Sequence, residues 1–226
     1  MNIDDFEKNR EGFLKPPGIL GSDEMRQASV LIALVLVENE YHFLFEKRNE
    51  DIRQGGEVCF PGGLFDQNID SSLQDTAIRE TVEELGITED KIELKGRIDT
   101  LFAPQAGMII ESFIGILDIE SIDELTLSSD EVSEVFLVPV SYFENNKPEI
   151  HKTRLVVEPY YFDKGGKKVT LLPVEDLKLP ERYHKPWGKN LINVYFYNSK
   201  PEMVWGFTAR LVLAFIKKLK RSGFSN

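Results

Sequence analysis

The sequence predicts one α/β domain built on a mixed sheet. Strand-like apolar runs recur along the chain, and two or three helical segments lie among them. The sequence contains no internal repeat, low-complexity tract or Ser/Gly-rich linker that would divide it. With 226 residues, of which 42% are hydrophobic and 29% charged, the chain can bury one substantial core.

The strands are predicted from runs of apolar and β-branched residues. Residues 30–37, VLIALVLV, are apolar throughout, as in a central strand buried on both faces. Residues 155–162 and 167–172, separated by Lys-Gly-Gly, predict a hairpin. Further strands are expected at 41–48, within 55–66 before a glycine-proline turn, and at 92–100, 108–117 and 134–140.

Two helices are predicted with their ends. The first spans about residues 72–85, because Asp70, Ser71 and Ser72 are competent N-caps and Gly86 suits the position after the last turn. Ser71 also has capping-box spacing to Gln74. The second spans about 207–220 and ends in basic residues that complement the helix dipole. Residues 1–25 are expected to form an N-terminal arm or helix, broken by KPPG.

Composition excludes several classes of protein. The net charge of −11 argues against nucleic-acid binding through phosphate contacts. The longest apolar run, 30–37, is far short of the roughly 20 residues that span a bilayer. The charged N-terminus has no apolar signal segment, and the single cysteine, Cys59, fits a reducing compartment and a buried structural thiol. We therefore expect a cytoplasmic protein without a membrane or nucleic-acid partner.

Three carboxylates crowd one edge of the predicted helix 72–85. At about 100° per residue, Glu80, Glu83 and Glu84 fall within an arc of roughly 100°. Such like charges repel one another, and hard cations such as Mg²⁺ or Mn²⁺, which take oxygen ligands, would cancel that repulsion. A solvated acidic face is the alternative, and the spacing alone leaves both interpretations open.

The region around these glutamates resembles the Nudix box, a G-x5-E-x7-R-E-U-x-E-E-x-G-U pattern in which U is a bulky apolar residue. Three departures stand out: the loop between Gly63 and Arg79 is two residues longer, its middle glutamate is missing, and Thr81 replaces an apolar residue. Asp70 is the acid that we expect to pair with Arg79. The matching residues are Gly63, Arg79, Glu80, Glu83, Glu84, Gly86 and Ile87.

The segment upstream, EKRNEDIRQGGEVCFPGG (46–63), resembles the element that precedes the box in the coenzyme A pyrophosphatase branch. Residues 130–143 and 204–213 resemble two further stretches of that branch. Residues 144–202 carry no familiar motif, and we expect an insert that covers substrate or forms a homodimer. The matching upstream residues are Lys47, Arg48, Arg53, Gly56, Glu57, Val58, Phe60, Pro61, Gly62, Gly63 and Asp66.

The resemblance implies a Nudix fold, a mixed sheet sandwiched between helices, in a single domain over 26–221. It implies metal-dependent hydrolysis of a nucleoside diphosphate derivative, with coenzyme A or an acyl-CoA giving 3′,5′-ADP and the matching 4′-phosphopantetheine. One to three Mg²⁺ or Mn²⁺ ions would act as cofactor. The residues implied are Glu80, Glu83, Glu84 and the Gly63 carbonyl for metal, Arg48, Arg53 and Arg79 for substrate, and Glu80 or Glu131 for activating water.

Several alternatives stay open. Asp130 or Glu134 could replace Glu131, because position in an acidic loop is the only observation behind it. The substrate could be ADP-ribose, NADH or another dinucleotide. A nucleotide sensor that does not cleave its ligand, and an acidic interaction domain without metal, are the two non-catalytic hypotheses.

Overall fold

The computed structural model describes residue 8 and residues 18–221. Most of the predicted N-terminal arm (1–25) therefore lies outside the described residues. Its last part is a turn followed by the 3₁₀-helix η2 (Ser22–Glu24), which leads directly into the first strand.

The centre of the fold is an eight-stranded mixed sheet, as predicted. β1 pairs in parallel with β7 and antiparallel with β2, and the main strand order is β3-β2-β1-β7-β5. β4 also pairs with β1, β6 with β7 and β8 with β2. The strands are β1 (Arg26–Val37), β2 (Glu40–Arg48), β3 (Val58–Cys59), β4 (Gly62–Leu64), β5 (Ile92–Arg97), β6 (Leu101–Ala103), β7 (Met108–Leu117) and β8 (Val132–Pro139).

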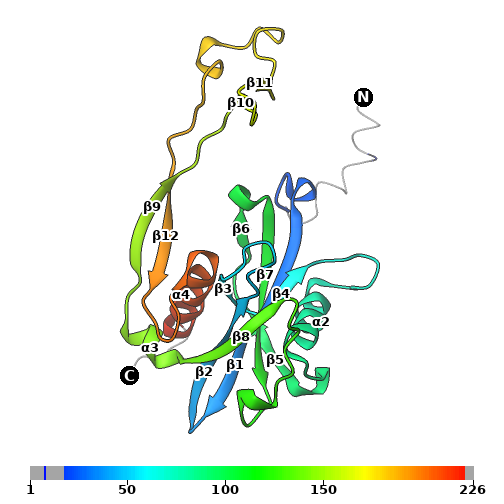
Figure 1. Cartoon of the computed structure of the whole chain (residues 1–226), viewed down its shortest axis with the longest axis vertical. Coiled ribbons are helices and arrows are strands. Elements are labelled where there is room, and N and C mark those ends of the chain that lie inside the picture. Colours follow the sequence, from blue (N-terminus) through cyan, green and yellow to red (C-terminus); the bar gives the residue numbers. More distant parts are fainter. Residues whose placement is uncertain (1–7, 9–17, 222–226) are drawn as a thin grey trace.

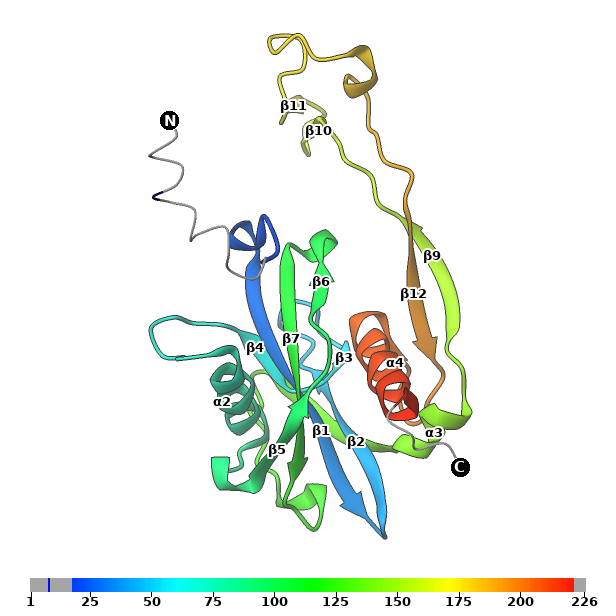
Figure 2. The same ribbon diagram turned by 180° about the vertical axis from the view of Figure 1, so that it is seen from behind.

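Two long helices cover the two faces of this sheet (Figures 1 and 2). α2 (Leu73–Leu85) lies on one face, where Ala77 and Leu85 pack with Leu31 and Leu44. α4 (Gly206–Arg221) lies on the other, against a cluster rich in phenylalanine that includes Phe43. The shorter helical elements are α3 (Val140–Asn145), η3 (Glu89–Lys91), η4 (Pro104–Ala106), η5 (Ile122–Glu124) and η6 (Glu181–Tyr183).

The central strand explains why helices are needed on both faces. Leu31, Ile32, Ala33 and Val35 of β1 are all fully buried, so consecutive side chains enter opposite clusters. The prediction for residues 30–37 is confirmed, although the strand begins at Arg26. The apolar run cannot show this earlier start, because β1 is set there by its pairing with β7.

A long arm leaves the domain after α3 and returns before α4 (Figure 1). Its base is a three-stranded sheet in the order β13-β12-β9, and its far end carries the two-stranded β10-β11 hairpin. The strands are β9 (Glu149–Arg154), β10 (Tyr160–Phe162), β11 (Lys168–Thr170), β12 (Leu191–Tyr197) and β13 (Val204–Trp205).

Three predicted boundaries need correction. The hairpin of 155–162 and 167–172 exists, but it pairs only over 160–162 and 168–170. The strand expected at 92–100 ends at Arg97, and that expected at 134–140 runs from Val132 to Pro139. In both cases pairing with a neighbouring strand decides where the strand ends, and apolar content does not report this.

Candidate functional site

The acidic helix is held at both ends by local sequence. Ser72, in extended conformation, caps α2 by accepting a hydrogen bond from the Asp75 amide at 3.2 Å. The prediction of a capping box between Ser71 and Gln74 is therefore wrong, because the N-cap residue is Ser72. Gly86 ends the helix in the left-handed conformation (φ 64°), as predicted, and its amide donates to the Val82 carbonyl.

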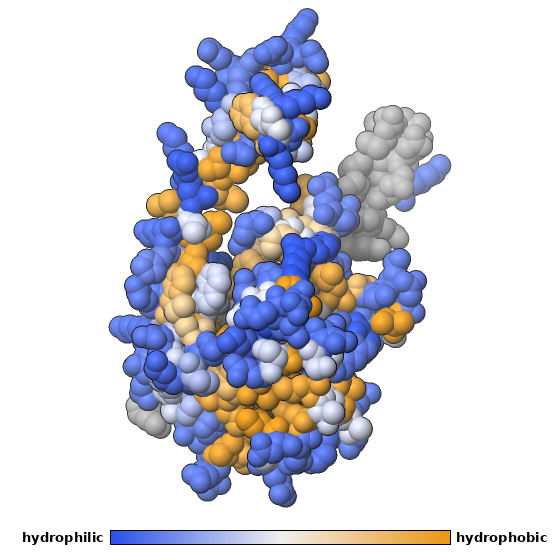
Figure 3. Space-filling model, in the orientation of Figure 1, coloured by the Kyte–Doolittle hydropathy of each residue, from blue (hydrophilic) through white to orange (hydrophobic). Residues whose placement is uncertain are grey.

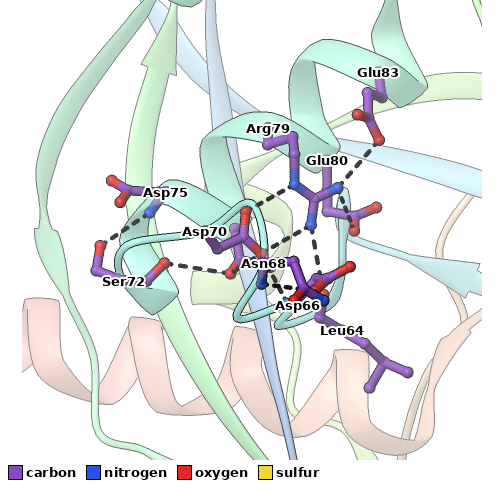
Figure 4. A network of polar contacts seen from close by, with 10 residues as sticks. Leu64, Asp66, Asn68, Asp70, Ser72, Asp75, Arg79, Glu80 and Glu83 are labelled. Carbon is purple, nitrogen blue, oxygen red and sulfur yellow. Dashed lines mark hydrogen bonds and ion pairs between the residues drawn. The ribbon is translucent and has the colours of Figure 1, made fainter.

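Arg79 ties the long loop before α2 to the helix (Figure 4). Its Nε donates to Asp70 Oδ1 at 2.8 Å and its Nη2 to Asp70 Oδ2 at 3.0 Å, which confirms the expected partner. Its Nη1 lies 2.8 Å from Glu80 Oε1 and 3.1 Å from Glu83 Oε2. This fork lowers the pKa of the nearly buried Asp70 below its usual range and raises the pKa of Arg79. The guanidinium is thus occupied by protein acceptors.

The three glutamates differ in their surroundings. Glu84 is buried, and its Oε2 accepts the Gly62 amide at 2.8 Å. Glu80 is partly buried and lies against Gly63, where a β-carbon would overlap its carboxylate. Glu83 is mostly exposed and turns toward Arg79. Desolvation raises the pKa of both Glu80 and Glu84.

A fourth acid, Glu46 of β2, joins this group, and sequence reasoning missed it. Its side chain is fully buried, Oε1 accepts the Cys59 thiol at 3.2 Å, and Oε2 has no hydrogen-bond donor. Burial raises the pKa of Glu46, and the pKa of Glu84 is raised by its own burial and by the Glu46 charge. The available signal was an acid that directly follows three apolar residues, 43–45, of a strand.

Glu131 lies in the loop before β8 and is exposed. Its charge contributes to raising the pKa values of Glu46, Glu80 and Glu84, which indicates that it lies close to all three. Glu134, one of the alternatives from sequence, instead lies 3.6 Å from the Lys47 ammonium. Among the candidate acids of this loop, Glu131 is the one whose charge acts on these three glutamates.

Of the two upstream arginines, Arg48 lies close enough to the cluster for its charge to act on it. Arg48 is half-buried, and its charge lowers the pKa of Glu46. Its Nε donates to the Arg53 carbonyl at 3.4 Å, while the Arg53 side chain is exposed. Fork-shaped guanidinium groups suit phosphate, so these arginines can bind an anion that approaches the acids.

Cys59 is half-buried, which is less than the sequence led us to expect. Its thiol donates to Glu46, and burial raises the pKa of Cys59 well above its usual value. A thiol that stays protonated is a poor nucleophile, so this geometry agrees with a structural role.

A cavity of about 570 Å³ opens beside the acidic helix. The loop that Asp70 and Arg79 hold in place forms most of its wall, so the longer loop shapes the space next to Glu80. The residues that line the cavity are Leu64, Phe65, Asp66, Gln67, Asn68, Ile69, Arg79 and Glu80.

The donor chemistry fits a hard divalent cation. Glu46, Glu80 and Glu84 supply carboxylate oxygens whose mutual repulsion a cation would cancel, and one of these oxygens is buried without a donor. Across residue 8 and 18–221, no three His, Cys, Asp or Glu side chains converge in a ready-made metal geometry. A cation would offset the repulsion between the Glu46 and Glu84 carboxylates.

The fold and the site together define the class of protein. A mixed sheet lies between helices, and Gly63 of β4 lies against Glu80 of α2. The NUDIX domain family model matches residues 25–158, more than half of the chain. The protein belongs to the Nudix family. Every helix among the described residues is too short or too polar to span a lipid bilayer.

Individual proteins are similar to this chain over different lengths. The protein is 26% identical to an uncharacterized Nudix hydrolase NudL of Photorhabdus laumondii, over 94% of this chain and 95% of that protein. It is 30% identical to the human mitochondrial coenzyme A diphosphatase NUDT8, over 75% and 66% respectively. It is 35% identical to Nudix hydrolase 3 of Caenorhabditis elegans, over 55% of this chain but only about half (52%) of that relative.

A solved structure of a C. elegans Ap4A hydrolase complex is also similar, with a TM-score of 0.42. Its sequence identity is 19%, over 51% of this chain and 81% of that one.

Proposed function

We propose that this protein hydrolyses the diphosphate bond of coenzyme A or an acyl-CoA, giving 3′,5′-ADP and the matching 4′-phosphopantetheine. The observation that carries the proposal is the cluster of Glu46, Glu80 and Glu84, with the Arg48 guanidinium near enough to lower the pKa of Glu46. Such an arrangement suits an anionic substrate that shares a cation with the protein. The coenzyme A assignment is supported by the GEVCFPGG stretch and by the similarity to coenzyme A diphosphatases.

Nudix hydrolases generally use divalent metal ions, and Mg²⁺ or Mn²⁺ is proposed here. The proposed ligands are Glu80, Glu83, Glu84 and the Gly63 carbonyl. The buried Glu46 adds a second negative charge next to Glu84. The cation would supply Lewis acidity toward the phosphate oxygens and the attacking water. Glu83 now accepts a hydrogen bond from Arg79 at 3.1 Å, so binding a cation would compete with this contact.

Water activation is assigned to a carboxylate of the chain. Glu80 and Glu131 are the candidates, because both lie in the electrostatic field of the cluster and neither is fully buried. Burial raises the pKa of Glu80, which makes it a stronger base than a free glutamate once it is ionised.

Substrate phosphate is assigned to Arg48 and Arg53. Arg79 was expected to bind substrate as well, and its four contacts to Asp70, Glu80 and Glu83 favour a positioning role instead. Arg79 would hold Glu80 in place and set the shape of the adjoining cavity.

Other substrates remain alternatives that experiment must separate, notably ADP-ribose, NADH and dinucleoside polyphosphates. The glutamates and arginines are proposed to bind a diphosphate group, which all of these substrates contain. A sensor without catalysis is less favoured, because the Arg79-Glu80 and Glu83-Glu84 pairs are intact, and a protein that only binds a nucleotide has less need of them. The cytoplasmic location and the homodimer remain predictions.

The test is cleavage of coenzyme A by the purified protein with Mg²⁺, with Mn²⁺ and with EDTA. ADP-ribose, NADH and a dinucleoside polyphosphate run in parallel, and products are separated by ion-exchange chromatography. We expect metal-dependent release of 3′,5′-ADP at the highest kcat/KM of the set. Faster cleavage of another substrate would replace coenzyme A, and metal binding without any cleavage would point to the sensor.

A further inference from the structure

The arm between Glu149 and Tyr197 has no core of its own. All of its residues are described, and between Glu149 and Phe196 only Pro159 is buried. Two-stranded ribbons are marginally stable in water without a surface to pack on. An arm of this kind is expected to pack against a protein surface.

Only the base of the arm packs on its own domain. Arg210 of α4 donates to the Asn193 carbonyl at 2.8 Å, and Phe196 stacks on Trp205 with ring centroids 5.7 Å apart. Beyond the base, the ribbon extends away from the sheet and helices in both views (Figures 1 and 2). The backbone hydrogen bonds of 155–190 close within that segment, as between Val157 and Trp187.

This distal segment, 155–190, exposes large apolar side chains. Each of them is between 46% and 63% exposed, and apolar residues recur along the arm in Figure 3. Exposed apolar residues that cluster in this way mark interaction surfaces. They are Val157, Tyr161, Phe162, Leu171 and Leu177.

The arm and the rest of the chain carry opposite charge. Residues 149–197 contain nine Lys and Arg against six Asp and Glu. The remaining residues contain eighteen basic and thirty-two acidic side chains, out of chain totals of 27 and 38. A basic, apolar arm is therefore complementary in charge to an acidic domain.

The domain offers a matching surface. In Figure 3 apolar residues gather over β8 and the neighbouring strand ends, and hydrophilic residues surround them. Val135 and Leu137 of β8 are partly buried. Exposed acids lie in the adjacent turns, namely Glu38, Glu40, Asp118, Glu120, Asp123 and Glu124.

We propose that the arm of one protomer docks on the acidic and apolar face of a second copy of this chain, forming a two-fold dimer. Two-fold symmetry makes each arm contact occur twice, which doubles the surface that one contact buries. Its own domain is the less suitable occupant, because the distal segment points away from it.

The first experiment is the mass of the full chain by light scattering after gel filtration, over a range of protein and salt concentrations. We expect twice 25.9 kDa at micromolar protein and dissociation as salt rises, because the charge complementarity is screened. A monomer at all concentrations would overturn the proposal.

Variants locate the interface. Replacing 156–189 by Asn-Gly should give a folded monomer, since Leu155 and Asn190 are already hydrogen-bonded at 3.0 Å. Phe162→Ser with Leu171→Ser keeps the arm and should weaken dimerisation at least 10-fold. Leu20→Ser, an exposed apolar residue outside both surfaces, is the matched control and should change nothing.

Two other outcomes would also overturn the proposal. A dimer that persists without the arm would use another face. A monomer whose KM rises when the arm is removed would mean that the arm covers its own substrate site. Because the mass is measured without substrate, failure of the coenzyme A assignment leaves this test intact.

Discussion

Gly63 on β4 lies against the carboxylate of Glu80 on α2, and a β-carbon at residue 63 would overlap that carboxylate. The strand end and the helix are therefore in van der Waals contact at the point where the metal site is proposed. Only a residue without a side chain lets Glu80 keep this position.

Gly63→Ala should displace Glu80 and lower kcat at least about 10-fold, with little loss of thermal stability, because Glu80 can swing toward the cavity. Steady-state kinetics and a melting curve measure the two effects. Gly18→Ala, where an added methyl meets no atom within 4 Å, is the control. Unchanged kcat would show that Glu80 needs no fixed position.

Glu84→Gln should lower kcat at least about 100-fold and leave the fold intact. The amide oxygen can still accept the Gly62 N–H, now at 2.8 Å, while the negative charge for the cation is lost. Circular dichroism checks the fold and calorimetric titration with Mn²⁺ checks binding. Retention of most of the activity would remove the proposed metal chemistry.

Asp70→Asn should destabilise the protein by about 2 kcal/mol, because it removes the charge from the acceptor of two Arg79 hydrogen bonds and leaves only Glu80 and Glu83 as charged partners. The folded pKa of Asp70 lies below its unfolded value of about 3.9, so this stabilisation is complete above that pH and disappears as pH falls further. Urea unfolding at pH 7 and at pH 3 measures the gap in the free energy of unfolding between wild type and variant. A gap that does not narrow in acid would contradict the ion pair.

Glu46→Gln should stabilise the metal-free protein at pH 8 by about 1 kcal/mol or more. The folded pKa of Glu46 is raised, so as pH rises above about 4.3 the unfolded state ionises first and the free energy of unfolding falls. Glutamine avoids this loss and still accepts the Cys59 thiol. The free energy of unfolding, measured at pH 8 in EDTA, tests this prediction. Glu93→Gln, at an exposed residue, is the control. Destabilisation at pH 8 would show that Glu46 is needed as a charge.

Arg53→Ala should raise KM for coenzyme A about 10-fold with kcat nearly unchanged, because a charged hydrogen bond is worth about 1.5 kcal/mol or more. Arg97→Ala, on the exposed β5 strand, is the matched control. An unchanged KM would return Arg53 to an ordinary surface residue.

The sequence determined the features that depend on local chemistry. The apolar run of 30–37 requires cover on both faces, the cap residues and Gly86 bound α2, and the periodicity of Glu80, Glu83 and Glu84 puts them on one edge. It also suggested Asp70 as the partner of Arg79, because few acids lie in the loop. These are short-range relations that spacing along the chain fixes.

Only the tertiary structure brought Glu46 beside Glu84, turned Glu83 toward Arg79, and occupied Arg79 with three acids. It also turned residues 149–197 into an extended arm. Glu46 and Glu84 are far apart in sequence and meet because α2 packs across the face of the sheet that β2 helps to form. Spacing along the chain cannot encode such a meeting, since it depends on which strand lies under the helix and on the energy of burying both.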